Sequence, residues 1–364
     1  MKKLVISSDS ISAAMKKLAL AVNSKSILPI LRNVYCKVNK GGVQFITSDQ
    51  EITISYTCEA DTEGAPFEML IPFDFLNKVS GLLKGEPIAI ELPSTRKAKI
   101  TGSDDIFELN SLDKLDEYPE VPAVPKKNRL KLEKGFIDLL SKSMDTCAKD
   151  AAIEALQFSC LDIQEKEINL VSTDTMALFK MKIEAEPSSV DQLLLSSKIA
   201  SAIDGIGDME LSWSQKQMAF VGEKISVWAT RHEGKYPNYK AIIPKYDWNL
   251  TLERSVLVKA LKKACLSSNE TKRTVLDFKS QPGKLHFETD DTELARRIEV
   301  NIPADFTGDV IKMAIHAGKL LTMMGQINTN TIRLAIDNPE KAIIVTSEEN
   351  ENYLGLIIPF KIGN

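Results

Sequence analysis

Three aspartates in this 364-residue chain share one local pattern: an apolar run and a Ser or Thr precede the Asp, and an alternating run follows it. They are Asp49, Asp174 and Asp290. Carboxylates that converge in space can hold two metal ions for phosphodiester hydrolysis, which defines one hypothesis, a metal-dependent nuclease. Asp and Ser or Thr side chains also bind backbone amides in turns. Because the aspartates lie 125 and 116 residues apart, the pattern favours one hairpin turn in each of three domains.

Other signatures of catalysis or ligand binding are missing from the sequence. Gly318–Lys319 lacks the upstream glycine and the following Ser or Thr of a phosphate-binding loop, and Gly205–Gly207 lacks the third glycine of a dinucleotide loop. The three histidines, His232, His286 and His316, have no partner at a metal-binding spacing. We therefore expect no metal, no cofactor and no catalysed reaction.

The composition is that of an ordinary globular protein, with 43% hydrophobic and 26% charged residues and a length that fits two or three domains. A net charge of −4 gives no overall attraction to nucleic acid, although a local basic surface is compatible with it. No apolar run approaches the roughly 18 residues of a membrane helix, and the N-terminal run is too short for a signal peptide. We expect a cytoplasmic protein with no membrane partner.

Each third of the chain carries the same series of secondary-structure signals. An amphipathic helical pattern comes first, a second short one follows beside a strand, and an alternating hairpin pattern comes last. The first helical patterns span 10–23, 134–148 and 254–268, the second lie within 71–92, 194–213 and 314–336, and the hairpins span 97–112, 217–231 and 341–359. This predicts an α+β fold: three tandem copies of a domain in which two helices pack on antiparallel sheets.

Two proline-bearing stretches, 117–128 and 235–248, separate these copies. Proline favours extended chain in the residue before it, so such stretches suit linkers between domains. The predicted domains are residues 1–122, 123–246 and 247–364.

Positive charge follows the helical patterns, whereas acidic residues crowd the loops and strands, as in 113–117 and 347–352. A single lysine on a helix is most often solvated. The same bias in three copies instead favours a shared basic helical surface. Such a surface suits contact with the phosphate backbone of DNA, which requires charge but no base-specific side chains.

Several segments then carry a resemblance to a known family. In chain order they are ILPILRNVYCKV (27–38), STD (172–174), YPNYKAIIP (236–244), LSSNETKR (266–273) and IIPFKI (357–362). Together with the triple repeat, these segments resemble the bacterial beta sliding clamps, the processivity subunit of DNA polymerase III. The resemblance covers the whole chain.

The resemblance implies a ring formed by a head-to-tail homodimer, with helices lining a hole around double-stranded DNA. It implies a non-catalytic protein that tethers the DNA polymerase, is opened by a clamp loader, and binds other replication and repair proteins through linear motifs. The subunit interface would bring Phe107 and Leu109 near Leu266 of a second copy. The DNA-facing residues would be Lys25, Lys142, Lys149, Lys198, Lys263, Lys272 and Arg273.

The resemblance also implies a hydrophobic peptide-binding pocket between the second and third domains. Its residues would be Ile153, Thr173, Thr175, Leu178, Pro237, Ile242, Leu356, Ile357, Ile358, Pro359 and Phe360. Many family members have Gly-His-Arg after the Thr-Asp, where this chain has Thr175, Met176 and Ala177, and Lys319 replaces an aromatic residue near the pocket. The apolar pocket is therefore expected, with a different polar rim.

Two alternatives to a ring remain open at this point. One is the metal-dependent nuclease that would use Asp49, Asp174 and Asp290. The other is a DNA-binding protein that forms no ring and holds DNA by charge alone. A ring differs from both because its link to DNA is topological and does not depend on charge.

Overall fold

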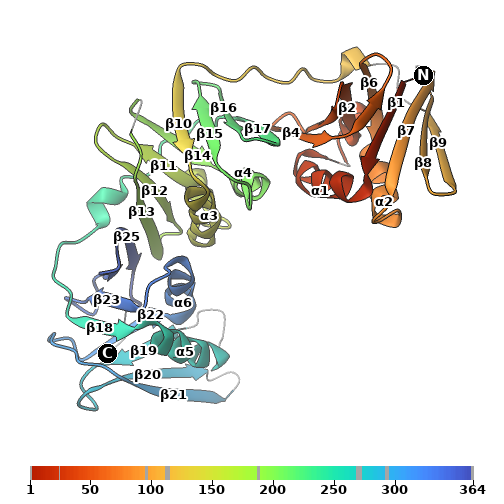
Figure 1. The fold of residues 1–364 in the computed structure, drawn as a ribbon. Coiled ribbons are helices and arrows are strands. Elements are labelled where there is room, and N and C mark those ends of the chain that lie inside the picture. Colours follow the sequence, from red (N-terminus) through yellow and green to blue (C-terminus); the bar gives the residue numbers. More distant parts are fainter. Residues whose placement is uncertain are drawn as a thin grey trace. The chain divides into compact units, whose positions relative to one another are not determined.

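The computed structural model describes residues 2–23, 25–94, 97–110, 115–186, 189–267, 273–291 and 295–361. The chain forms two compact units, whose elements are labelled in Figure 1. The first contains Met1–Ile137 and Lys198–Arg231, and the second contains Asp138–Ser197 and His232–Asn364. Within the described ranges, every helix is too short or too polar to cross a membrane.

The first unit contains an eight-stranded antiparallel sheet in the order β10-β15-β16-β17-β4-β3-β2-β6. Four of its strands come from the first third of the chain and four from the middle third, and β17 pairs with β4 where they meet. The strands are β2 (Asn33–Asn39), β3 (Gly42–Ser48), β4 (Ile52–Glu59), β6 (Phe67–Pro72), β10 (Asn128–Leu132), β15 (Met209–Trp213), β16 (Gln217–Val221) and β17 (Ile225–Thr230).

The second unit contains an equivalent sheet in the order β14-β11-β12-β13-β25-β24-β23-β18. Here β13 of the middle third pairs with β25 of the last third. The strands are β11 (Ser159–Ile163), β12 (Ile168–Thr173), β13 (Ala177–Ile183), β14 (Asp191–Leu195), β18 (Leu250–Glu253), β23 (Thr331–Ala335), β24 (Ile343–Ser347) and β25 (Asn350–Ile357). A strand hairpin therefore continues the sheet of the preceding copy at both internal junctions.

Two smaller sheets remain, one in each unit. The first unit has β5-β1-β7-β8-β9, and the second has β21-β20-β19-β22. Their strands are β1 (Lys2–Ser7), β5 (Asp61–Glu63), β7 (Pro87–Ser94), β8 (Lys97–Gly102), β9 (Asp105–Asn110), β19 (Arg273–Asp277), β20 (Lys284–Asp291), β21 (Arg296–Pro303) and β22 (Lys312–His316). In the described sheets β9 and β21 are edge strands.

Among the described residues, two α-helices accompany each copy, as the sequence predicts. They are α1 (Ser8–Leu18) and α2 (Phe73–Leu82), α3 (Lys134–Ser143) and α4 (Ser197–Ile203), and α5 (Arg254–Ala264) and α6 (Ala317–Gln326). Short 3-10 helices are η1 (Ala19–Ala21), η2 (Pro29–Arg32), η3 (Leu115–Glu117), η4 (Met144–Thr146), η5 (Glu154–Gln157), η6 (Tyr239–Ile242) and η7 (Cys265–Ser267). The predicted three-copy α+β fold is confirmed, while the boundaries after residues 122 and 246 stay a prediction.

Helix α1 illustrates why these segments are helical. The Ser7 hydroxyl accepts a hydrogen bond from the Asp9 amide at the N-terminus, which satisfies one of the free N–H groups of the first turn. Ile11, Met15 and Leu18 are buried at a spacing that places them on one face. That face packs on β4 and on α2, and α5 packs in the same manner on β21 and α6.

Candidate functional site

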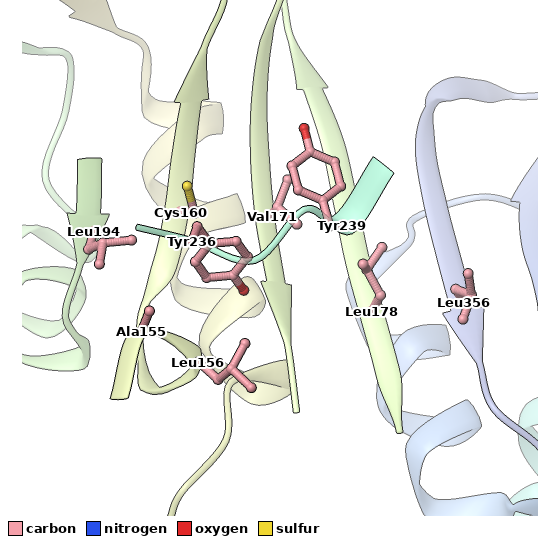
Figure 2. Packing of buried hydrophobic residues seen from close by; sticks show 9 residues of the cluster. All are labelled: Ala155, Leu156, Cys160, Val171, Leu178, Leu194, Tyr236, Tyr239 and Leu356. Atoms are coloured by element: carbon pink, nitrogen blue, oxygen red, sulfur yellow. The ribbon is translucent and has the colours of Figure 1, made fainter. Parts of the chain in front are cut away.

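A cluster of buried apolar side chains joins strands β11, β12, β13, β14 and β25 to the segment before η6 (Figure 2). That segment carries Tyr236 and leads into Tyr239, the first residue of η6, and it crosses the strands that bear Cys160, Val171 and Leu178. The full cluster is Ala155, Leu156, Cys160, Val171, Leu178, Leu194, Tyr236, Tyr239 and Leu356. Strands from the middle and last thirds of the chain thus share one core here.

Most of the predicted pocket residues lie in or beside this cluster. Leu178 and Leu356 belong to it, and Ile358 packs against it. Thr173, Ile357 and Pro359 are buried, and Pro237 is half-buried. The predicted residues with the most exposed apolar side chains are Ile153 and Ile242, which are 53% and 51% exposed.

Both exposed isoleucines border the cluster through their chain neighbours. Ile153 directly precedes η5, whose Ala155 and Leu156 are cluster members. Ile242 ends η6 and is followed by Ile243, which packs against the cluster. A buried apolar floor with exposed aliphatic groups at its border can accept apolar side chains of a peptide.

Phe360 is the exception among the predicted pocket residues, because it lies against β22 and not in the cluster. Its amide donates a hydrogen bond to the carbonyl of Ala314, with an N···O distance of 2.7 Å. Its ring stacks with that of His316 at a centroid distance of 6.4 Å. Phe360 therefore lies beside β22 and outside this cluster, and its assignment to the peptide-binding pocket stays a prediction.

The hairpin turn between β12 and β13 forms the polar border of the cluster. Oδ1 of Asp174 accepts hydrogen bonds from the amides of Met176 and Ala177 at 3.0 and 2.9 Å. Thr175, which lies between Asp174 and Met176, has a φ of 76°, in the left-handed region. The Ile358 amide donates to the Met176 carbonyl at 2.9 Å, which fastens the terminal segment to this turn.

A buried carboxylate, Asp162, supports the segment around η6 and was not among the residues predicted from the sequence. The Tyr239 hydroxyl donates to Oδ2 of Asp162 at 2.7 Å, and Nζ of Lys240 lies 3.6 Å from the same oxygen. The side-chain amides of Gln164 and Gln192 donate to Oδ1. Burial alone would raise the pKa of Asp162, but these hydrogen bonds hold it below its ordinary value. The available signal was an Asp that stands between Leu161 and Ile163 in strand β11.

The first aspartate of the repeated pattern repeats the geometry of Asp174. Oδ1 of Asp49 accepts hydrogen bonds from the amides of Glu51 and Ile52 at 3.1 and 2.9 Å, and Gln50 has a φ of 77°. The second oxygen of each aspartate binds a lysine at the start of the next copy's second helix. Asp49 binds Lys198 of α4 at 2.7 Å, and Asp174 binds Lys319 of α6. The hairpin-turn prediction is confirmed at these two positions.

The third aspartate was assigned to the wrong residue. Asp290 lies inside β20, and Asp291 follows it as the last residue before the hairpin loop. A buried hydroxyl side chain precedes the other two aspartates by two residues, at Thr47 and Ser172, and Thr289 is its counterpart. Asp291 is therefore the equivalent residue. The sequence Thr-Asp-Asp offered two candidates, and only the strand register distinguishes them.

The nuclease hypothesis requires carboxylates that are grouped to hold metal ions. Across the ranges that the structure describes, no three His, Cys, Asp or Glu side chains form such a group. Asp49 and Asp174 instead bind backbone amides and a lysine, which is the structural alternative.

The predicted DNA-facing residues occupy several settings. Lys142 and Lys263 lie in the last turns of α3 and α5, while Lys25 and Lys149 are exposed in the loops after the first helices. Arg273 begins β19 opposite His316, so it lies on a strand and not at a helix end. Helix α5 ends at Ala264 and is followed by η7, which ends at Ser267, so the helical segment stops before Arg273. Lys272 lies outside the described residues.

The positive charge of Lys198 is partly compensated by neighbouring carboxylates, which the sequence did not indicate. Its ammonium lies 2.7 Å from Oδ2 of Asp49 and 3.5 Å from Glu51. Burial alone would lower the pKa of Lys198, but the hydrogen bond and charge of Asp49, aided by Glu51, raise it. Lys17 of α1 is likewise engaged, since it donates to the carbonyls of Ser201 and Asp204 at the end of α4.

The predicted interface residues lie on edge elements. Phe107 and Leu109 are half-buried on β9, and the Phe107 ring packs edge-on against Phe75 of α2 at 6.2 Å. Leu266 is 70% exposed in η7. Edge strands leave backbone N–H and C=O groups available for pairing with another chain.

Comparison with known proteins gives consistent matches across the chain. The family model for the DNA polymerase III beta subunit N-terminal domain matches residues 2–122, and that for its C-terminal domain matches residues 240–361. A beta sliding clamp of Streptococcus pneumoniae is 23% identical over 359 residues, with 94% of each chain covered. The crystal structure of the Bacillus subtilis sliding clamp covers 100% of both chains at 18% identity and a TM-score of 0.90. A Pseudomonas aeruginosa clamp bound to griselimycin matches 99% of this chain and 100% of its own at 17% identity and 0.89.

Proposed function

The chain belongs to the DNA polymerase III beta subunit family, the beta sliding clamps, and on this premise we propose that two copies form a ring around duplex DNA. The ring slides on DNA and tethers the replicative polymerase, which makes synthesis processive. A tether makes each rebinding of the polymerase intramolecular, so a weak contact suffices. The protein acts without catalysing a reaction, in the cytoplasm, and neither the nuclease nor the non-ring alternative is supported.

This proposal rests on how strands of neighbouring copies pair to extend the sheets. Inside the chain, the last hairpin strand of one copy pairs with the strand after the Asp turn of the preceding copy, as β17 does with β4 and β25 with β13. One strand of each kind, β9 and β21, has no such neighbour in the described sheets. Pairing β9 of one subunit with β21 of the other uses both. Two such contacts in a head-to-tail dimer close a ring.

At the subunit interface, Phe107 and Leu109 supply apolar contacts on β9, and we place Leu266 near them on the facing subunit. The α5 helix that precedes Leu266 packs on β21, so its end accompanies that edge. Three domains per subunit, with boundaries after residues 122 and 246, give a ring of six similar domains.

DNA contact is assigned to the basic residues at and after the helix ends: Lys25, Lys142, Lys149, Lys198, Lys263, Lys272 and Arg273. Contact with phosphates requires no base readout, and base readout would arrest sliding. Because Lys198 is paired with two carboxylates, we expect its contribution to be the smallest of the lysines whose side chains the structure describes.

Partner peptides would bind at the cluster described above, between Ile153 and Ile242. These peptides belong to the polymerase, the clamp loader and other proteins with clamp-binding linear motifs. Support comes from the buried floor of Leu178 and Leu356 and from the exposed isoleucines beside it. The terminal segment through Ile358 is fastened to the Met176 carbonyl, so the floor is pre-organised.

Griselimycin tests this site, because the Pseudomonas aeruginosa clamp structure contains it. We expect the wild-type chain to bind it in isothermal titration calorimetry and Ile242→Asp to weaken binding at least tenfold, because a carboxylate would be desolvated against the apolar floor. Ile311→Asp is the matched control, since Ile311 is 59% exposed and belongs to no part of the cluster. Equal binding by Ile242→Asp and the control would place the peptide site elsewhere.

A further inference from the structure

The two internal junctions pair their strands in the same register, counted from the Asp turn. Ile52 is the residue that closes the Asp49 turn, and it lies opposite Ala229 of β17. Ala177 closes the Asp174 turn and lies opposite Ile357 of β25. In both junctions the pairing then continues over five residues of each strand. The register is thus a property of the repeated domain.

The same count can be applied to β9 and β21. Arg296 lies opposite Asp291 at the closure of the β20–β21 hairpin, which makes it the counterpart of Ile52. The β8–β9 hairpin closes at the pair Gly102 and Asp105, and the β16–β17 hairpin closes at the pair Gly222 and Ile225. Counted from these pairs, β9 corresponds residue by residue to β17. Leu109 is then the counterpart of Ala229. In a junction of the same kind, Leu109 faces Arg296, Glu108 faces Arg297, and Phe107 faces Ile298.

The faces of the two strands agree with this register. Along β21, Val300 and Ile302 are buried and Ile298 is half-buried, so these residues point toward the core side of the sheet. Phe107 and the aromatic ring that it contacts on α2 lie on the core side of β9. A shift by one residue would oppose Glu108 and Ile298 and place charge on the apolar face.

We propose that the ion pair between Glu108 of one subunit and Arg297 of the other determines which edges of identical subunits join. This inference rests on the proposed ring. Acidic residues line the β9 hairpin at Asp104, Asp105 and Glu108, and Arg296 and Arg297 open β21. A β9–β9 contact would bring acids together, whereas a β9–β21 contact brings opposite charges together.

The two internal junctions have uncharged residues at the position that corresponds to this ion pair. There, Trp228 faces Thr53, and Leu356 faces Leu178. Strands inside one chain are held together by the chain itself and need no selection of partners. Strands that meet from separate molecules do need it, because an edge strand otherwise accepts any other edge.

Arg297 is already held in position by carboxylates of its own subunit. Its guanidinium lies 3.0 Å from Glu288 and 2.7 Å from Glu299, and its side chain is 61% exposed. Two carboxylates that fix the guanidinium reduce the entropy that its side chain would lose on pairing. Glu108 is exposed and would become its third carboxylate.

A charge-swap experiment tests the proposal through the symmetry of the ring. Glu108→Arg and Arg297→Glu are each measured by sedimentation velocity and native mass spectrometry. Each single variant has two defective contacts per dimer, and we expect its dimer dissociation constant to rise about ten- to a hundredfold. An equimolar mixture forms a heterodimer with one native and one swapped contact, so dimers should return. Arg297→Gln replaces Arg297→Glu in the mixture if the charge reversal lowers folding, as monitored by circular dichroism.

Arg129→Glu is the control partner for Glu108→Arg, because Arg129 pairs with Glu210 on its own subunit. In that mixture Arg129→Glu should dimerise with itself as the wild type does, and no swapped contact can form, so native mass spectrometry should show less heterodimer than in the first mixture. Undiminished dimers in the single variants, or no recovery in the first mixture, would overturn the ion pair while leaving a wild-type dimer and the ring intact. A wild-type chain that is monomeric at every concentration would instead overturn the proposed ring.

Discussion

Two turn residues adopt a left-handed backbone conformation that their side chains disfavour. Gln50 and Thr175 occupy the same place after the hairpin aspartates, with φ values of 77° and 76°. Glycine adopts this conformation without steric cost, and a β-branched residue pays the largest penalty. The resemblance places glycine at the position of Thr175 in many family members, so this chain keeps the turn at a cost that the Asp174 hydrogen bonds offset.

Replacing Thr175 with Gly should therefore stabilise the chain, by about 0.5–1 kcal/mol, since relief of strain exceeds the added entropy of the unfolded state. Gln50→Gly should give a smaller gain, because Gln is not branched at Cβ. Urea-induced unfolding measures both. Thr57→Gly is the control, an exposed position in β4 where glycine should destabilise. A loss of stability in Thr175→Gly would refute the strain argument.

A second residue-scale prediction concerns the pH dependence contributed by Asp162. Its pKa is lower in the folded chain than its ordinary value of 3.8, so the stabilisation is present above that pH and is lost as the pH falls through the folded pKa. Asp162→Asn should destabilise by about 1–3 kcal/mol at pH 7, because hydrogen bonds to the charged group are lost.

The difference between Asp162→Asn and the wild type should narrow as the pH is lowered below 3.8 in a series of unfolding measurements. Glu165→Gln, an exposed change in the adjacent loop, should leave the pH profile unchanged. A gap of constant size from pH 7 to pH 2 would show that the charge of Asp162 contributes nothing to stability.

At the scale of elements, each hairpin aspartate links a turn to the second helix of the next copy. Asp49 binds two backbone amides and Lys198, so it satisfies the turn and the helix start together. The side chain of Lys198, within the part of the chain that the structure describes, contacts the carboxylates of Asp49 and Glu51. The two partners should therefore differ in their importance to the first unit.

Asp49→Asn should destabilise more than Lys198→Gln, and the double variant should cost less than the sum of the single changes. We expect a coupling of about 0.5–1 kcal/mol, which is typical of a partly exposed ion pair. A double-mutant cycle by urea unfolding at two salt concentrations measures it. Zero coupling at low salt would mean that the ion pair is incidental to the junction.

Elements were more predictable than their pairing. Helices α1 and α5, and hairpins such as β16–β17, follow from periodicity because their contacts are local. The pairing of β17 with β4 joins residues far apart in sequence, and no local pattern encodes it. For the same reason Asp290 was chosen over Asp291, and the pairing of Phe360 with β22 was not foreseen.

At the scale of the whole molecule, the internal junctions define what a subunit lacks. Both eight-stranded sheets are completed within the chain, while β9 and β21 remain at edges of the smaller described sheets. Joining these edges with a second copy would give two nine-stranded sheets beside the four eight-stranded sheets of the two chains. A closed ring follows from the same domain contact used three times per subunit.

A ring closed around DNA is linked to it topologically, and comparing retention on circular and linear DNA detects such a link. The protein is loaded onto nicked circular plasmid with its clamp loader and ATP, washed at high salt, and measured before and after the plasmid is cut once. Salt screens charge but cannot unthread a ring. A ring that encircles DNA is retained on the circle and lost from the linear form, whereas equal loss from both forms would show that the protein holds DNA by charge alone.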